Sequence, residues 1–69
     1  MVNTMNALMQ LSDLDALRRT QKKSLRQLSL DTGLKVGALW RIFHGQNFDI
    51  RKVWMVCRAL GVSLDRLEF

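Results

Sequence analysis

The chain has 69 residues, of which 48% are apolar, and a formal net charge of +5. This length predicts one small domain, and the apolar content excludes a disordered chain. Proline is absent, while good helix formers such as leucine, methionine, arginine and lysine are frequent. An all-α fold is therefore expected. One cysteine and one histidine exclude an internal disulfide and a zinc cluster.

Several functional classes are also disfavoured. The sequence offers no carboxylate pair, no nucleophile with a base and no phosphate-cradling glycine loop, so we expect no enzyme, no cofactor and no metal. No basic residue precedes an apolar run at the start, so a signal peptide is not expected. No stretch approaches the ~18 apolar residues of a membrane span. The apolar stripes are short and separately capped, which disfavours a membrane-surface helix. We expect a cytoplasmic protein that does not bind membranes.

Residues 1–11 carry no charged side chain and have apolar residues at helical spacing. This pattern fits a marginal helix and equally a flexible arm, because chain ends fray unless they are tied down. We expect this segment to be an N-terminal arm without an assigned role. Residues 12–69 are expected to form the domain.

The first helix of the domain is predicted over Asp13–Gln21, with Ser12 as its N-cap. Leu14 and Leu17 would face the core. Acidic residues precede basic ones along this helix, which is the order that the helix dipole favours. The basic cluster from residue 18 to residue 23 follows, and phosphate contact is favoured there over a merely solubilising role.

The stretch from Ser24 to Gln46 predicts two short helices joined by a tight turn. Ser24 and the glutamine three residues later form a capping-box pattern before a helix over Leu25–Thr32. Gly33 is suited to the left-handed conformation that ends a helix. A second helical pattern runs over Val36–His44. A short helix, a glycine turn and a second short helix are typical of a helix-turn-helix, whose second helix lies in the DNA major groove in DNA-binding versions.

The second of these helices has two distinct faces. Its inward face is predicted to consist of Leu39, Ile42 and Phe43. Its outward positions are Lys35, Val36, Gly37, Trp40, Arg41 and His44. Arg41 is suited to the edge of a guanine, whose two acceptors match its fork of donors. Trp40 is equally compatible with burial against the preceding helix and with DNA contact. A close approach, either to DNA or to the preceding helix, would explain Gly37.

Positive charge is concentrated in the middle of the chain. Residues 16–48 contain seven basic residues and one acid, a net +6, whereas residues 1–15 carry −2 and residues 49–69 carry +1. The basic part therefore coincides with the two short helices and the segment before them. This is where phosphates of a nucleic acid would lie.

The clearest amphipathic helix is predicted over Ile50–Leu60, with Asp49 as its N-cap. Its apolar stripe is expected to be core and consists of Ile50, Val53, Trp54, Cys57 and Leu60. Cys57 is interpreted as a small buried hydrophobe rather than a nucleophile. A last short helix is predicted over Leu64–Leu67, capped by Ser63.

Three segments together resemble a known family. These are SLRQLSLDTGL, ALWRIFHGQ and IRKVWMVCRALGVSLDRL, which stand in the order and spacing of lambda-repressor-like domains of the Cro and xenobiotic-response-element type. The resemblance covers roughly residues 12–68. It implies a compact five-helix domain with its helix-turn-helix at the second and third helices. It also implies a sequence-specific regulator of transcription, most often a repressor, which binds double-stranded DNA as a homodimer.

The resemblance also implies roles for individual residues. The expected base contacts are Val36, Gly37, Trp40 and Arg41. The expected contacts to the DNA backbone are Arg18, Ser24, Leu25, Arg26, Lys35, His44, Gln46 and Asn47. The chain departs from many relatives at Val36 and Gly37, where polar base readers are usual. It departs again at Phe43, where an acid often pairs with an arginine of the first helix. Arg18 would then lack its partner. Either Arg18 is free to contact a phosphate, or sequence specificity relies more on the shape of the DNA.

A second class of function stays open. Lambda-repressor-like domains also serve as antitoxins or as other modules that bind a protein partner such as a toxin. The apolar arm or the C-terminal tail would then hold the partner. For the homodimer, the candidate interface residues are Met55, Val62, Leu64 and Phe69.

Overall fold

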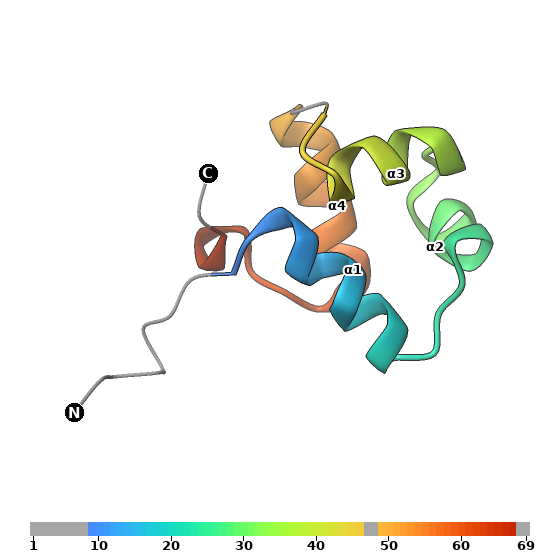
Figure 1. Ribbon diagram of the computed structural model, residues 1–69, viewed down its shortest axis with the longest axis horizontal. Coiled ribbons are helices and arrows are strands. Elements are labelled where there is room, and N and C mark those ends of the chain that lie inside the picture. Colours follow the sequence, from blue (N-terminus) through green and yellow to red (C-terminus); the bar gives the residue numbers. More distant parts are fainter. Residues whose placement is uncertain (1–8, 47–48, 68–69) are drawn as a thin grey trace.

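The computed structural model describes residues 9–46 and 49–67, and all of its regular elements are helical (Figure 1). The α-helices are α1 (Leu11–Thr20), α2 (Leu25–Thr32), α3 (Val36–Phe43) and α4 (Ile50–Leu60), and a 3-10 helix, η2 (Leu64–Arg66), follows. The all-α prediction is confirmed. The expected fifth α-helix is wrong, because the described part of the chain has four α-helices and this single 3-10 turn. Residues 1–8, Asn47 and Phe69 lie outside the described residues.

The chain leaves the helical conformation at Leu67, which explains the missing fifth helix. Leu67 is extended, with φ −92° and ψ 142°, and it forms a parallel bridge with Met9. The Met9 amide donates to the Arg66 carbonyl at 2.7 Å. The hydroxyl of Ser63 donates to the carboxylate of Asp65, so it does not cap a helix amide. Pairing with Met9 therefore replaces a further helical turn.

Helix α1 begins two residues earlier than predicted. Gln10 is its N-cap, and the Gln10 amide donates to Oδ2 of Asp13 at 2.8 Å. The prediction of Ser12 as the cap is wrong, because the Asp13 side chain reaches back to Gln10 and leaves Ser12 inside the first turn. Leu11, which the sequence pattern places in the arm, is the first residue of this helix.

The remaining helix boundaries follow their predicted caps. Helix α2 has the predicted limits, and Oγ of Ser24 accepts from the Gln27 amide at 2.9 Å. The Gln27 side chain donates to Asp31 at 2.8 Å instead of closing the capping box. Helix α3 ends one residue early, with His44 as its C-cap. Helix α4 has the predicted limits, and Asp49 accepts from the Arg51 amide at 3.0 Å.

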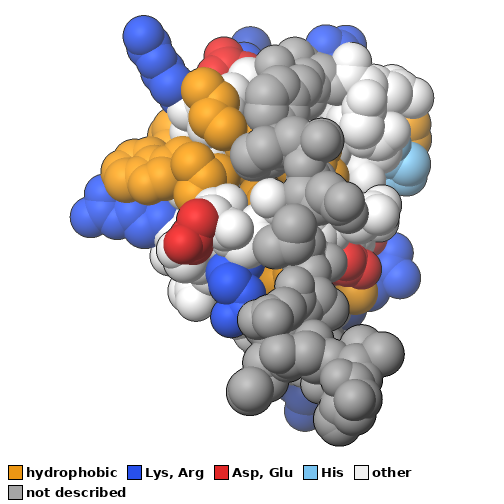
Figure 2. Space-filling view, turned by 90° about the vertical axis from the view of Figure 1, so that its left-hand side faces the viewer, with side chains coloured by type: hydrophobic (Ala, Val, Ile, Leu, Met, Phe, Trp, Pro, Cys, Tyr) orange, Lys and Arg blue, Asp and Glu red, His pale blue; other side chains and the backbone are white. Residues whose placement is uncertain are grey.

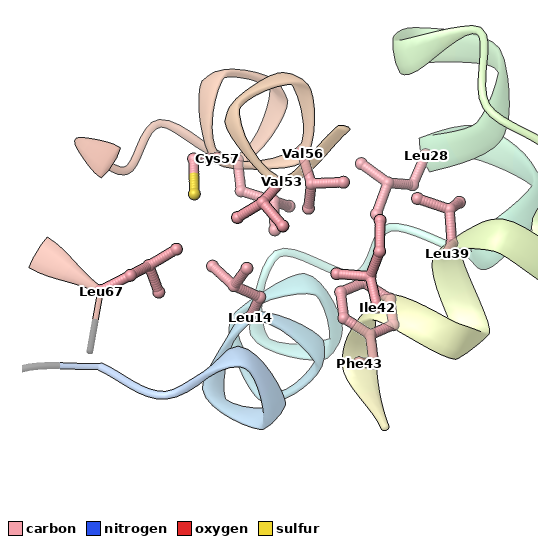
Figure 3. Close-up of a cluster of buried hydrophobic side chains, with 10 residues drawn as sticks. Leu14, Leu28, Leu39, Ile42, Phe43, Val53, Val56, Cys57 and Leu67 are labelled. Carbon is pink, nitrogen blue, oxygen red and sulfur yellow. The ribbon is translucent and has the colours of Figure 1, made fainter. Parts of the chain in front are cut away.

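The core lies where all four α-helices meet η2 and the residue after it (Figure 3). Its buried apolar side chains are Leu14, Leu28, Leu39, Ile42, Phe43, Val53, Val56, Cys57, Leu60 and Leu67. The buried stripe of α4 differs from the predicted one. Val56 is fully buried, whereas Ile50 is 44% and Trp54 46% exposed. At 3.6 residues per turn, Ile50 and Trp54 lie about 70° and 110° from the centre of the buried stripe, so both lie on its flank.

The segment between α1 and α2 covers the C-terminal end of α4. Gln21 Nε2 donates to the Leu60 carbonyl at 2.8 Å, and Lys23 Nζ donates to the Ala59 carbonyl at 3.2 Å. A cation and an amide donor are favourable at helix carbonyls that lack an internal partner. Lys23 also pairs with Asp31 of α2 at 3.0 Å. These contacts fix the start of α2 against α4.

Candidate nucleic-acid interface

A short polar turn sets the position of α3 relative to α2. Gly33 has φ +79°, the left-handed conformation that a glycine adopts without strain. Oγ1 of the buried Thr32 donates to the Leu28 carbonyl at 2.8 Å and accepts from the Leu34 amide at 3.1 Å. Ser29 donates to the Leu34 carbonyl. Thr32 was not among the predicted site residues, since its only signal is a hydroxyl in the last helical turn before a glycine.

Helix α3 presents one buried and one exposed face. Its three inward residues fill the core, and every residue predicted to face outward is exposed. Val36 is 43% and Trp40 45% exposed. Val36, Trp40 and His44 follow each other at intervals of four residues, with Gly37 and Arg41 alongside, so they form one surface strip. The two-faced character predicted for this helix is confirmed.

Trp40 and His44 form a stacked aromatic pair on that strip. Their ring centroids are 3.9 Å apart with an interplanar angle of 21°, and Nδ1 of His44 lies 2.8 Å from the Trp40 carbonyl oxygen. The sequence left open whether Trp40 is buried against the preceding helix, and its exposure excludes this. The pair forms an aromatic surface next to Arg41.

The space around Gly37 is open. A Cβ built on Gly37 meets no atom within 4 Å. The close approach to the preceding helix that would explain Gly37 is therefore not present. Nothing in the described part of the chain accounts for a glycine at this position of the exposed strip.

Four exposed cations lie in or near α2 and α3. Within residues 9–46 and 49–67, Lys22, Arg26, Lys35 and Arg41 make no ion pair. Arg26 lies in α2, Arg41 lies in α3, Lys35 is the N-cap of α3, and Lys22 lies in the turn after α1. Of the seven basic residues counted between residues 16 and 48, these four are therefore unpaired within the described chain, whereas Arg18, Arg19 and Lys23 pair with acids. Counterions would neutralise the four charges in solution, and a polyanion would release these counterions.

Arg18 is engaged within the chain, so the prediction that it lacks a partner is wrong. It pairs with Asp15 at 2.7 Å and donates to the Lys23 carbonyl at 2.9 Å. Its side chain is only 12% exposed. Asp15 lies one turn earlier in α1 and is the ion-pair partner of Arg18. The role of Arg18 in the structure is to hold the segment before α2 in place.

The other expected backbone contacts lie at the start of α2 and after the end of α3. Ser24 and Arg26 are exposed at the start of α2, and Gln46 is exposed after α3. The side chain of Leu25 packs against the core. The backbone amides of Leu25 and Arg26 have no acceptor among the described residues, because the first amides of a helix have no internal partner. Asn47 lies outside the described residues.

The expected interface residues of a homodimer lie around α4. Met55 and Leu64 are half-buried and line a shallow hollow beside Trp54. Val62 packs against the core instead. Phe69 lies outside the described residues. Helix α3 contributes no residue to the lining of this hollow.

Three further properties of the described part of the chain are its potential metal ligands, the exposure of its thiol and the apolar length of its helices. Residues 9–46 and 49–67 contain no group of three or more potential metal ligands. Cys57 is buried, and this burial raises the pKa of its thiol, as expected for a packing residue. None of the described helices has the length and apolar character needed to cross a bilayer.

The surface of α2 and α3 thus combines exposed cations, open helix amides and a stacked aromatic pair. No protein-family model, curated protein or solved structure matches the chain.

Proposed function

We propose that the chain is a sequence-specific DNA-binding regulator of transcription, acting as a repressor in the cytoplasm. In this proposal α2 and α3 form a helix-turn-helix of the lambda-repressor-like type, and α3 enters the major groove of double-stranded DNA. The observation that carries it is the exposed strip of α3, which has no packing role within the described chain. The exposed cations in and near α2 and α3 support the same proposal.

Base recognition would depend on few side chains. Arg41 is the only outward residue of α3 with a fork of donors that fits the two acceptors of guanine. Val36 offers an apolar contact for a thymine methyl. Trp40, stacked on His44, offers a rigid apolar surface. Gly37 allows the α3 backbone to approach the groove closely, because no side chain stands there.

Contacts to phosphate would fix the register. The open amides at the start of α2, with Ser24 and Arg26, favour an anion at that helix end. Lys35 is the N-cap of α3, as Ser24 is of α2, and Gln46 lies after the end of α3. Arg18 acts indirectly in this proposal, because its ion pair and hydrogen bond position the segment before α2.

Selection of bound fragments from random DNA, followed by sequencing, tests the proposal directly. Enrichment of one motif supports a sequence-specific reader, and a palindromic motif supports the homodimer. Arg41→Ala should then lose roughly 1–3 kcal/mol at one base pair and tolerate any base there. Arg66→Ala is the matched control, because it removes the same charge from η2, which lies at the far side of the domain from α3 (Figure 1).

Two results would reject the proposal. Recovery of no enriched motif at low salt would argue against a sequence-specific reader. Equal losses for Arg41→Ala and Arg66→Ala would show that only overall charge matters, and Arg41 would lose its assigned role.

A second candidate function is a protein-binding module, such as an antitoxin that holds a toxin. The exposed Ile50 and Trp54 favour it, since large apolar side chains exposed together often mark a protein contact. Purification of a stable heterocomplex, combined with no mobility shift of any DNA fragment, would favour this candidate over the DNA reader.

A further inference from the structure

The outer side of α4 carries an apolar surface that the proposed DNA contact does not use. Ile50 and Trp54 are exposed, and the half-buried Met55 and Leu64 line one hollow together with them. Figure 2 shows hydrophobic side chains gathered at one side of the view, with charged side chains around them. We call this surface the Trp54 face, which consists of Ile50, Arg51, Trp54, Met55, Arg58 and Leu64.

Two hollows adjoin each other on the Trp54 face. Trp54 and Met55 line both of them. The apolar hollow, of about 420 Å³, is completed by Ile50, Arg51 and Leu64. The other hollow, of about 510 Å³, extends to Arg58 and to the end of α2. Helix α3 lines neither hollow, so the face is separate from the residues that are proposed to read bases.

The charged residues that line these hollows leave an excess of positive charge. Arg51 and Arg58 are exposed and make no ion pair within residues 9–46 and 49–67. The single acid in the two linings is Asp31, which is paired with Lys23 at 3.0 Å. The two arginines lie about two turns apart on α4, or about 10 Å along its axis. A binding partner should therefore bring carboxylates at a similar spacing.

One of these cations also holds the indole of Trp54. The guanidinium carbon of Arg58 lies 5.2 Å from the centroid of the Trp54 ring, a cation–π contact. A guanidinium in such a contact can still bind a carboxylate through the N–H donors at its edge. An anchor that is rigid before association loses less conformational entropy on binding. The pair is therefore suited to hold a partner that has apolar and acidic side chains next to each other.

Two other kinds of anionic partner match this face less well. A nucleic acid would pair with the arginines but would leave the apolar hollow unused. An anionic membrane would offer both charge and apolar material, but no single side chain that enters a hollow of this size. A helix of another protein, with one apolar side and carboxylates at its edge, supplies both kinds of contact.

We propose that the Trp54 face binds an acidic amphipathic helix of a partner protein. An apolar side chain of the partner enters the apolar hollow beside Trp54, and two of its carboxylates, about two turns apart, pair with Arg51 and Arg58. In this mode of recognition the apolar anchors supply the affinity, and the charges at the edge fix the orientation. The interaction goes beyond the proposed DNA reading and does not depend on it.

Titration of a labelled synthetic peptide with the full chain, without DNA, tests the proposal. The peptide is an alanine-based helix with leucines on one side and glutamates two turns apart at the edge of that side. Fluorescence anisotropy reports its binding. Trp54→Ala should lower the affinity roughly 30-fold or more, the effect of losing a dominant interface residue. Trp40→Ala is the matched control and should bind like the parent, because Trp40 has nearly the same exposure but lies on α3.

The charges are tested from both sides of the interface. Arg51→Gln and Arg58→Gln should each lower the affinity about 2–5-fold, as expected for ion pairs at the edge of an interface. Arg41→Gln is their control and should have no effect on peptide binding, because it removes an exposed, unpaired arginine of α3. A peptide with glutamine in place of glutamate should bind the parent more weakly and with less dependence on salt.

A second signal protects the test from a folding defect. In a Trp40→Phe chain, Trp54 is the only indole. Its emission should shift to shorter wavelength as the peptide covers it. Every variant should also keep the circular dichroism of the parent, because each replaced side chain is exposed.

Several results would overturn the proposal. These are a parent that does not bind the peptide at low salt, equal losses for Trp54→Ala and Trp40→Ala, and equal affinities for the glutamate and glutamine peptides. Binding to vesicles of phosphatidylcholine and phosphatidylserine in place of the peptide would assign the face to a membrane instead. Self-association through Trp54 that excludes the peptide would assign it to a second copy. None of these results bears on DNA selection, so the failure of this interface and the failure of DNA reading are distinguishable.

Discussion

Gly37→Ala should make the folded protein more stable. The residue lies in the first turn of α3 with no positive φ, and an added Cβ meets no atom within 4 Å. The substitution therefore introduces no clash and reduces the freedom of the unfolded chain. The full helix-interior difference between alanine and glycine is about 1 kcal/mol. Because the first turn is less demanding than the interior, a gain of about 0.5 kcal/mol in the free energy of unfolding is expected.

Gly33→Ala is the matched comparison and should have the opposite sign. Gly33 has equally open surroundings but φ +79°, a conformation that costs a residue with a Cβ about 1–2 kcal/mol. Urea unfolding followed by circular dichroism should separate the two variants by roughly 1.5 kcal/mol or more. Since 1 kcal/mol shifts the Tm of a domain this small by about 4–8 °C, thermal scans should separate them as well. Loss of stability in Gly37→Ala, or gain in Gly33→Ala, would refute the reasoning.

Gly37→Ala also tests the proposed DNA contact. If the α3 backbone approaches a base pair closely, the new methyl group of Gly37→Ala obstructs the contact, and affinity for the selected DNA should fall although the protein is more stable. Stability and binding then change in opposite directions. Unchanged affinity would show that DNA does not approach the chain at this residue.

Two further predictions concern the start and end of α2. Ser24→Ala should cost about 1 kcal/mol in the free energy of unfolding, because the Gln27 amide loses its acceptor. Ser12→Ala should change stability by less than about 0.5 kcal/mol, as for an ordinary surface substitution, and equal losses in urea unfolding would contradict the assigned cap. The Gln27 amide and the Lys23 ammonium hold the pKa of Asp31 below its usual 3.8. A carboxyl with a lowered pKa stabilises the fold above its unfolded pKa, and this contribution is lost as pH falls below that value. The free energy of unfolding of Asp31→Asn should therefore decline less than that of the parent between about pH 5 and pH 2, and parallel curves would exclude the effect.

Local signals account for the parts of the fold that were predicted well. The limits of α2 and α4 follow from Ser24, Gly33, Asp49 and Gly61, because a capping side chain or a left-handed glycine acts on its own helix end. The two faces of α3 follow from its apolar spacing. Such features depend on residues a few positions apart and can be read directly from the sequence.

Features that depend on distant or competing contacts were missed. Ser12 and Gln10 are both plausible caps, and only the reach of Asp13 decides between them. The exposure of Trp54 depends on how far α4 is rotated against its neighbours, which its own apolar pattern does not determine. The prediction of a fifth helix was wrong because Leu67 pairs with Met9, which lies at the other end of the described domain.

The candidate site was likewise predicted only in part. The exposed positions of α3 and the basic surface were predicted, since both follow from periodicity and charge. The engagement of Arg18 was not predicted, although its partner Asp15 lies only three residues earlier in α1, because the family resemblance directed attention to Phe43 instead. The contribution of Thr32 becomes visible only when the turn has brought the Leu34 amide to its hydroxyl.

The bridge between Met9 and Leu67 joins the two ends of the described domain on the side away from α3 (Figure 1). Met9 and Leu67 therefore lie where the chain enters and leaves the described domain, far from the outward face of α3. The same proximity makes the domain a good scaffold for circular permutation, in which a short linker joins the old ends and new ones are opened in a surface loop. A single pair of residues thus brings together the two points at which the described domain could be joined by a linker.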